Sequence, residues 1–277
     1  MATKTWSGAI DGNFGTAGNW VGGVAPVDTD SIIFPSGNAV SVTSGLTTGV
    51  AIVSMWVQEG YMGSIGTAAS AMTVTSLTAL DYAGRGQFCK IGSAGTIALA
   101  NIDVNSGNAF YAASGTWTRI NASGRGGTID VDAAAVLTAA YNASSSVVWT
   151  IGYNATGITT LKNIGVAISS RSIASYLGSG PGSLTTRLAA AITTTAVIAR
   201  DHVFNHQSSG TITFMDLLPG GRFPCSVCTS PFTITNVDEW SGSFLNDNPP
   251  GITITFTNPR NKVGRGSSPV GSPGSGL

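Results

Sequence analysis

Three short phrases near the C-terminal end alternate apolar and hydroxyl side chains: Thr211-Ile212-Thr213-Phe214, Phe232-Thr233-Ile234-Thr235 and Ile252-Thr253-Ile254-Thr255-Phe256. Alternation with a period of two residues is typical of a strand that buries one face. The phrases begin at residues 211, 232 and 252, so the steps between them are 21 and 20 residues. A strand that returns after a fixed step of this length is typical of a stacked, coil-like β architecture. The pattern therefore predicts an all-β chain folded as a β-solenoid.

Similar alternating segments continue from residue 40 to residue 200, for example at 40–43 (VSVT), 96–99 (TIAL) and 128–131 (TIDV). Turns that carry glycine and serine separate them, as expected between successive strands. Residues 133–140 and 188–199 could form short helices by propensity, although the threonines and β-branched residues of the second favour a strand. We expect a right-handed parallel β-helix.

The composition supports a packed β protein with few charges. Of the 277 residues, 42% are hydrophobic and 9% are charged, whereas about a quarter of an ordinary domain is charged. Thirteen basic residues balance thirteen acidic ones, so no long-range attraction draws the chain to nucleic acid or to an anionic membrane. The absence of net charge also removes the repulsion that keeps monomers apart, which favours a fixed assembly.

The sequence carries no signal for secretion, membrane insertion or a disulfide framework. The first residues lack an apolar signal core, and no run of about 18 apolar residues occurs. Three cysteines are an odd number and do not indicate a set of disulfides. We therefore expect neither a cleaved leader nor a membrane span.

The chain divides into three predicted parts. Residues 1–40 form a capping segment in which Trp6 and Trp20 are large apolar plates among small residues, suited to cover the open end of a β stack. Residues 41–258 form the solenoid body. Residues 259–277 are rich in Gly, Ser and Pro and predict an extended, flexible tail.

The opening segment resembles that of β-helical proteins found in phage virions and in autotransporter-like surface proteins. The resemblance covers about the first forty residues and is a loose spacing of aromatic, asparagine, proline and aspartate positions. It rests on Trp6, Asp11-Gly12-Asn13-Phe14, Asn19-Trp20, Gly22-Gly23, Pro26, Asp28, Asp30 and Ile33. It implies a β-solenoid on a particle or cell surface, and it implies no catalytic residue.

Two histidines and two cysteines form the sharpest candidate site. His202 and His206 lie four residues apart, and Cys225 and Cys228 lie three positions apart about one coil later. Zinc takes four nitrogen and sulfur ligands, and residues four apart on a strand face the same way. The order of the pairs and their context fit no usual zinc finger, which favours buried cysteines and surface histidines instead. A disulfide between the cysteines is a third alternative, so zinc is the one candidate cofactor in a chain otherwise expected to bind none.

Other motifs favour a structural interpretation. Asp28 with Asp30, and Asp130 with Asp132, could bind a cation or hydrolyse a glycosidic bond, but such pairs also occur on solvated strand faces. The glycine loops at residues 84–86 and 124–127 lack the ending of a phosphate-binding loop. Arginine is common at protein interfaces. The residues expected at an interface are Trp6, Trp20, Arg85, Arg125, Arg260 and Arg265.

The sequence therefore predicts a structural protein and no enzyme, since no nucleophile, base and orienting group form a credible triad. The favoured hypothesis is a capsid decoration or cement protein on the surface of a phage virion. Its partners would be the major capsid protein or another virion protein, and copies of itself, with a trimer favoured. The alternative is a glycan-binding or glycan-cleaving β-helix, such as a tail spike or a polysaccharide lyase.

Overall fold

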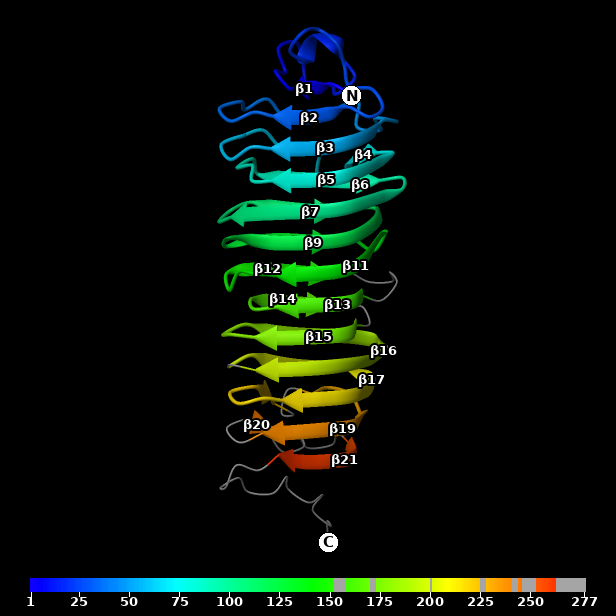
Figure 1. The fold of residues 1–277 in the computed structure, drawn as a ribbon, viewed down its shortest axis with the longest axis vertical. Helices are drawn as coiled ribbons and strands as arrows, with labels where there is room; N and C mark the ends of the chain where they lie inside the picture. The colour runs from blue at the N-terminus through cyan, green and yellow to red at the C-terminus, as the bar shows by residue number, and fades with distance from the viewer. Residues whose placement is uncertain are drawn as a thin grey trace. The chain divides into compact units, whose positions relative to one another are not determined.

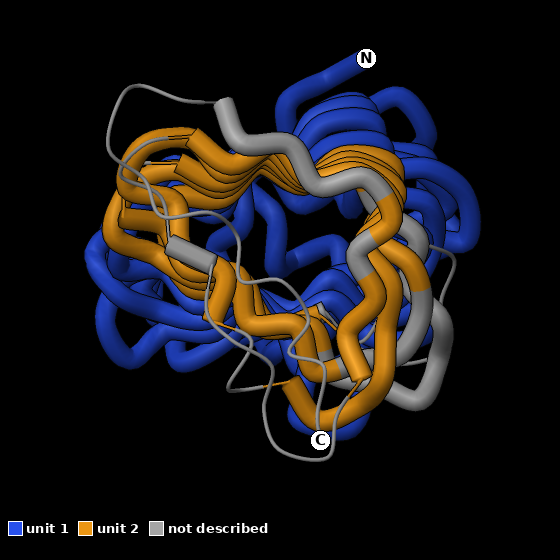
Figure 2. The backbone as a smooth tube through the Cα atoms, turned by 90° about the horizontal axis from the view of Figure 1, so that it is seen from below, with its two compact units in different colours: residues 1–155 blue, residues 156–277 orange. Residues whose placement is uncertain are grey.

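The computed structural model describes residues 1–151, 158–169, 173–199, 201–224, 228–240, 244–245 and 253–262. Strands dominate these residues, and the described part of the chain holds one 3-10 turn, Ala17–Asn19, and no α-helix. The all-β, β-solenoid prediction is confirmed. Within the same residues, no helix is long and apolar enough to cross a membrane. The chain separates into two compact units, residues 1–155 and 156–277 (Figure 2).

Unit 1 stacks parallel strands in two series (Figure 1). One series pairs β1, β2, β3, β5, β7, β9 and β11 in that order, and the other pairs β4, β6, β8, β10 and β12. The strands are β1 (Thr3–Thr5), β2 (Ser31–Phe34), β3 (Ala51–Val57), β4 (Met72–Val74), β5 (Ser76–Tyr82), β6 (Phe88–Ser93), β7 (Thr96–Asn105), β8 (Ala109–Ala112), β9 (Gly115–Arg125), β10 (Gly127–Val131), β11 (Ala135–Asn142) and β12 (Val147–Ile151). Residues 133–140, which could have been helical, thus lie mostly in β11.

Unit 2 follows the same plan with longer strands. They are β13 (Ile158–Asn163), β14 (Val166–Ser169), β15 (Ile173–Ser179), β16 (Ser183–Ala199), β17 (Val203–Leu217), β18 (Arg222–Phe223), β19 (Phe232–Trp240), β20 (Phe244–Leu245) and β21 (Ile254–Lys262). Parallel pairing runs from β13 through β15, β16, β17 and β19 to β21. β21 ends at Lys262, so residues 259–262 are strand and not tail, whereas residues 263–277 lie outside the described residues.

The three alternating phrases do lie on neighbouring coils, but the predicted step is wrong. Thr211 pairs with Thr233, and Thr233 pairs with Thr255, so each step is 22 residues (233 − 211 and 255 − 233). An even step keeps Ile212 opposite Ile234, and both side chains are buried. An odd step would place each hydroxyl side chain opposite an apolar one and reverse the faces of one strand.

The core of each unit consists of inward side chains stacked from coil to coil. In unit 1, for example, Ile97, Trp117 and Leu137 occupy one register column and are fully buried. Burial of each such side chain contributes about 1.5–3 kcal/mol relative to exposure. The sheet spacing of about 4.8 Å brings these side chains into contact with the next coil.

An aromatic lid packs against the first coil of unit 1, as predicted for the capping segment. The rings of Trp6 and Trp20 meet edge to face with centroids 5.2 Å apart, and Phe14 packs against Trp20 at 5.0 Å. Both indoles also contact Phe34 of β2, at 6.0 and 6.2 Å. Each indole N–H is satisfied, since Trp6 donates to the carbonyl of Val40 at 3.0 Å and Trp20 to that of Phe14 at 2.8 Å.

Candidate functional site

The histidines belong to the core of unit 2, which corrects the expectation of surface imidazoles. His202 precedes β17 and His206 lies within it, and both are fully buried. His202 shares a hydrogen bond between Nε2 and the Tyr176 hydroxyl, and His206 shares one between Nδ1 and the Thr186 hydroxyl at 2.9 Å. Phe204, between them on the same face, packs against His206 with ring centroids 5.8 Å apart. These imidazoles therefore fill space in an aromatic stack.

Burial also sets the protonation of the two rings. It lowers the pKa of His202 to about 4, against a smaller opposite effect from the backbone of Gly180. Burial likewise lowers the pKa of His206 to about 4. Both rings are therefore neutral at pH 7, which is the form that a metal ion requires.

The described residues give no support to the predicted zinc site. They contain no cluster of three or more His, Cys, Asp or Glu side chains that could hold a metal ion. Cys228 is buried, and Cys225 lies outside the described residues, so the disulfide and zinc alternatives stay predictions. Nε2 of His206 is buried without a hydrogen-bond partner among the described atoms, yet one such nitrogen is not a coordination site.

The candidate carboxylate pairs serve the backbone. Asp28 accepts a hydrogen bond from the amide of Ala51 at 2.8 Å, and Asp30 accepts one from the amide of Ala2 at 2.7 Å. In β10, burial raises the pKa of Asp130, in part opposed by a hydrogen bond from Thr150. These contacts stabilise the coils and form no paired catalytic carboxyls.

The predicted interface residues fall into three groups. Trp6 and Trp20 are fully buried in the lid, so the structure corrects their assignment: their side chains offer no surface to a partner. Arg125 is exposed at the end of β9. Arg260 lies in β21, opposite Asp238 in the register, and Arg265 lies outside the described residues.

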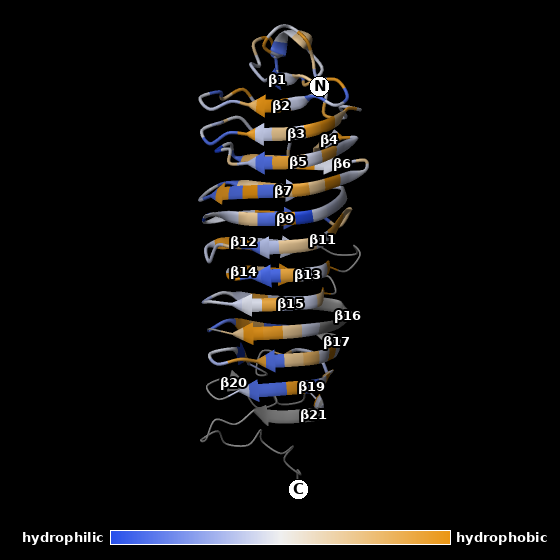
Figure 3. Ribbon diagram, viewed as in Figure 1, coloured by the Kyte–Doolittle hydropathy of each residue, from blue (hydrophilic) through white to orange (hydrophobic). Residues whose placement is uncertain are grey.

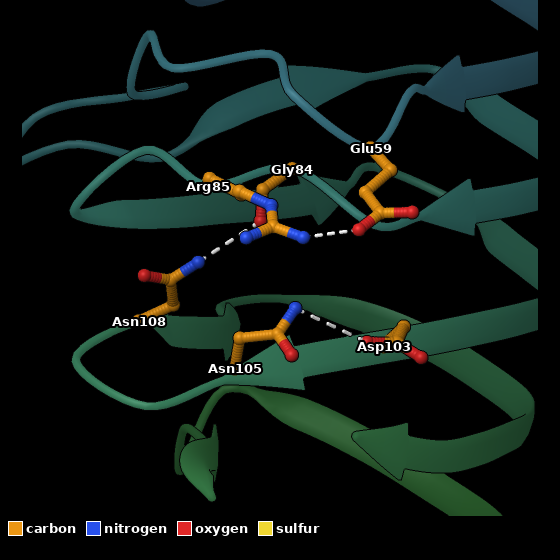
Figure 4. Close-up of polar contacts among 6 residues, drawn as sticks. All are labelled: Glu59, Gly84, Arg85, Asp103, Asn105 and Asn108. Atoms are coloured by element: carbon orange, nitrogen blue, oxygen red, sulfur yellow. Dashed lines mark hydrogen bonds and ion pairs between the residues drawn. The ribbon is translucent and has the colours of Figure 1, made fainter. Parts of the chain in front are cut away.

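Arg85 belongs to a polar network along the turns of unit 1 (Figure 4). Its guanidinium pairs with Glu59 of the preceding coil, and the two side chains are 52% and 69% exposed. Asn108, one coil further on, donates to the carbonyl of Gly84 at 3.0 Å. Ion pairs this exposed contribute at most about 1 kcal/mol, so this network orders the turns more than it stabilises the fold.

The most regular surface feature is a column of outward side chains on β3, β5, β7, β9 and β11, which we call the polar ladder. Its members are Trp56, Asp81, Asn101, Asn121 and Tyr141, each opposite the next in the register. Asn101 donates to Asp81 at 2.7 Å, and Asn121 donates to Asn101 at 2.8 Å. Hydrophilic segments recur in β5, β7 and β9 in Figure 3. The ladder therefore runs across the coils, along the direction in which they stack.

A second set of polar contacts borders the ladder. Arg119 donates from Nε to Asn121 at 2.8 Å, and its guanidinium lies over the ring of Tyr141, 4.3 Å from the centroid. On the other side, Asp103 accepts hydrogen bonds from Ser123 at 3.2 Å and from Asn105 at 3.4 Å (Figure 4). The sequence analysis missed these residues. The available signal was the equal spacing of residues 81, 101, 121 and 141, in steps of 20.

No protein-family model, curated protein or solved structure matches the chain.

Proposed function

We propose that the chain is a structural protein of a phage virion, a capsid decoration protein that stabilises the shell by touching several shell subunits. The observation that carries the proposal is the register-locked stack of parallel strands whose first coil is covered by its own aromatic lid. A stack of this kind behaves as a stiff body, because each coil is hydrogen-bonded to the next along whole strands.

The balance of charge supports the same proposal. Thirteen basic and thirteen acidic side chains leave no net repulsion between copies, so a homo-oligomer, with a trimer favoured, can form around shell subunits. Several weak contacts made at once give firm retention without any strong single contact. Exposed Arg125 and the Arg85–Glu59 pair are suited to such polar contacts.

Particle fractionation tests this function. Particles from the source culture are banded in a density gradient, and the fractions are probed with an antibody against the chain. We expect the chain to band with the particles, and particles that lack it to open at a lower temperature. A chain found only in the soluble fraction would contradict the proposal.

A second candidate, glycan binding, is favoured by the exposed indole of Trp56 at one end of the polar ladder. Incubation of the purified protein with bacterial surface polysaccharide separates binding from cleavage, because only cleavage shortens the chains. Release of oligosaccharides would favour an enzyme over both structural and binding roles.

A further inference from the structure

We propose that the polar ladder of unit 1 is a binding face for a neutral oligosaccharide that lies across the coils, from Trp56 toward Tyr141. The site does not depend on a role in a shell, because it uses only side chains of one copy. The four coil steps between its ends span roughly 19 Å at the usual strand spacing. That length accommodates several sugar rings of an extended chain.

Trp56 provides the apolar part of the site. Its side chain is 49% exposed, although its neighbours Met55 and Val57 are buried in the core. Most large aromatic side chains of this chain are buried, so an indole left half in solvent indicates a surface kept for a ligand. A flat aromatic ring fits the C–H face of a sugar ring, whereas Asp81, directly opposite on β5, can accept hydrogen bonds from its hydroxyls.

The two asparagines provide matched donors and acceptors. Asn101 and Asn121 each use one N–H of the amide within the ladder, which leaves each a second N–H and an acceptor lone pair. A sugar hydroxyl both donates and accepts, and an amide can satisfy both roles. Because the ladder and Arg119 already hold these amides in place, a ligand loses less conformational entropy on binding.

The surroundings of the ladder favour a chain of neutral sugars over other extended ligands. Small outward side chains border it, with Ala79 on one side and Ser123 on the other, so the column can be reached. The carboxylates of Asp81 and Asp103 would repel an anionic polysaccharide. A peptide could not add here as a strand, because the backbones of β5, β7 and β9 are paired on both sides.

A glycan array tests the proposal with the full-length protein. The labelled protein is applied to neutral bacterial, plant and fungal oligosaccharides and to their uronic-acid and sulfated counterparts, and hits are titrated by tryptophan fluorescence. We expect neutral oligosaccharides to bind, and Trp56→Ala and Asn121→Ala each to weaken binding at least tenfold. Trp240→Ala is the matched control, since this indole is 39% exposed in unit 2 and should leave affinity unchanged.

Melting temperatures keep a binding defect distinct from a folding defect. Trp56→Ala removes an exposed side chain that makes no ladder hydrogen bond, so the variant should melt within a few degrees of wild type. The proposal is overturned if no neutral oligosaccharide binds at millimolar concentration, if only anionic glycans bind, or if Trp56→Ala binds as tightly as wild type. A loss of affinity in Trp240→Ala equal to that in Trp56→Ala would also overturn it, because the site would then lie elsewhere.

Discussion

At the scale of single residues, the two buried histidines make unit 2 sensitive to acid. Each has a pKa lowered by burial from 6.5 to about 4. Between these values the unfolded chain binds protons and the folded chain does not, so stability is complete above pH 6.5 and falls as the pH drops toward 4. The loss levels off below pH 4 and amounts to about 2 to 3 kcal/mol for each histidine.

Urea unfolding at pH values from 7 to 4.5 measures this loss, in a window above most carboxylate titration. His206→Phe removes one titrating ring and keeps an aromatic side chain beside Phe204 and Phe232. We expect about half of the acid-induced loss in this variant. A variant with the same pH dependence as wild type would show that His206 does not titrate in this range.

Gly178 tests how closely the same stack is packed. A Cβ atom on Gly178 would lie 2.3 Å from Cδ2 and 2.9 Å from Cγ of His202, a buried ring with no room to move. Gly178→Ala should therefore lower the free energy of unfolding by about 1–3 kcal/mol, as is typical of overpacked cores. Gly15→Ala is the control, because its nearest contact would be an ordinary 3.5 Å to Asn13, and its stability should change little. Equal effects in the two variants would contradict the tight packing.

The burial of the histidines could have been predicted from the sequence. Positions 202, 204 and 206 share one face of a strand, and the residue between the histidines is Phe204. Polar residue type outweighed this alternation in the sequence analysis. The Tyr176 and Thr186 hydroxyls that make burial tolerable come from other coils, and only the register reveals them.

At the scale of elements, the polar ladder should stabilise the pairing of β5, β7 and β9. Asn101 is its central member and makes two side-chain hydrogen bonds, one to each neighbouring coil. Asn101→Ala should lower the free energy of unfolding by about 1–2 kcal/mol, since exposed hydrogen bonds each contribute about 0.5–1.5 kcal/mol. Thr118→Ala, at an exposed position of β9, should change stability by less than about 0.5 kcal/mol. Equal stability of the two variants in chemical denaturation would contradict this role.

The strands were predictable because alternation is local, whereas the lengths of the coils were not. Ser54 pairs with Ala79, a step of 25 residues (79 − 54), but Ile158 pairs with Ile173, a step of 15 (173 − 158). The strands must keep register, but the turns between them can lengthen without breaking a ladder bond. A fixed period therefore identifies the architecture and misplaces individual partners.

At the scale of the whole molecule, a stack of coils distributes its stability from neighbour to neighbour, so damage at one end should fade with distance. Trp20 is 1% exposed and packs against Trp6, Phe14 and Phe34. Trp20→Ala should cost about 3–5 kcal/mol locally, the usual range for a buried aromatic residue. In hydrogen exchange, we expect faster exchange in β1 and β2, a smaller change in β3 and wild-type rates by β11.

The matched control for the lid is Trp56→Ala, which removes an indole of the same unit that is 49% exposed. Because that indole lies outside the core, exchange in β1 and β2 should stay at the wild-type rate. If Trp20→Ala instead accelerates exchange equally from β1 to β11, unit 1 unfolds in one cooperative step. In that case the lid would hold the whole unit together, and its loss would remove the polar ladder along with the first coil.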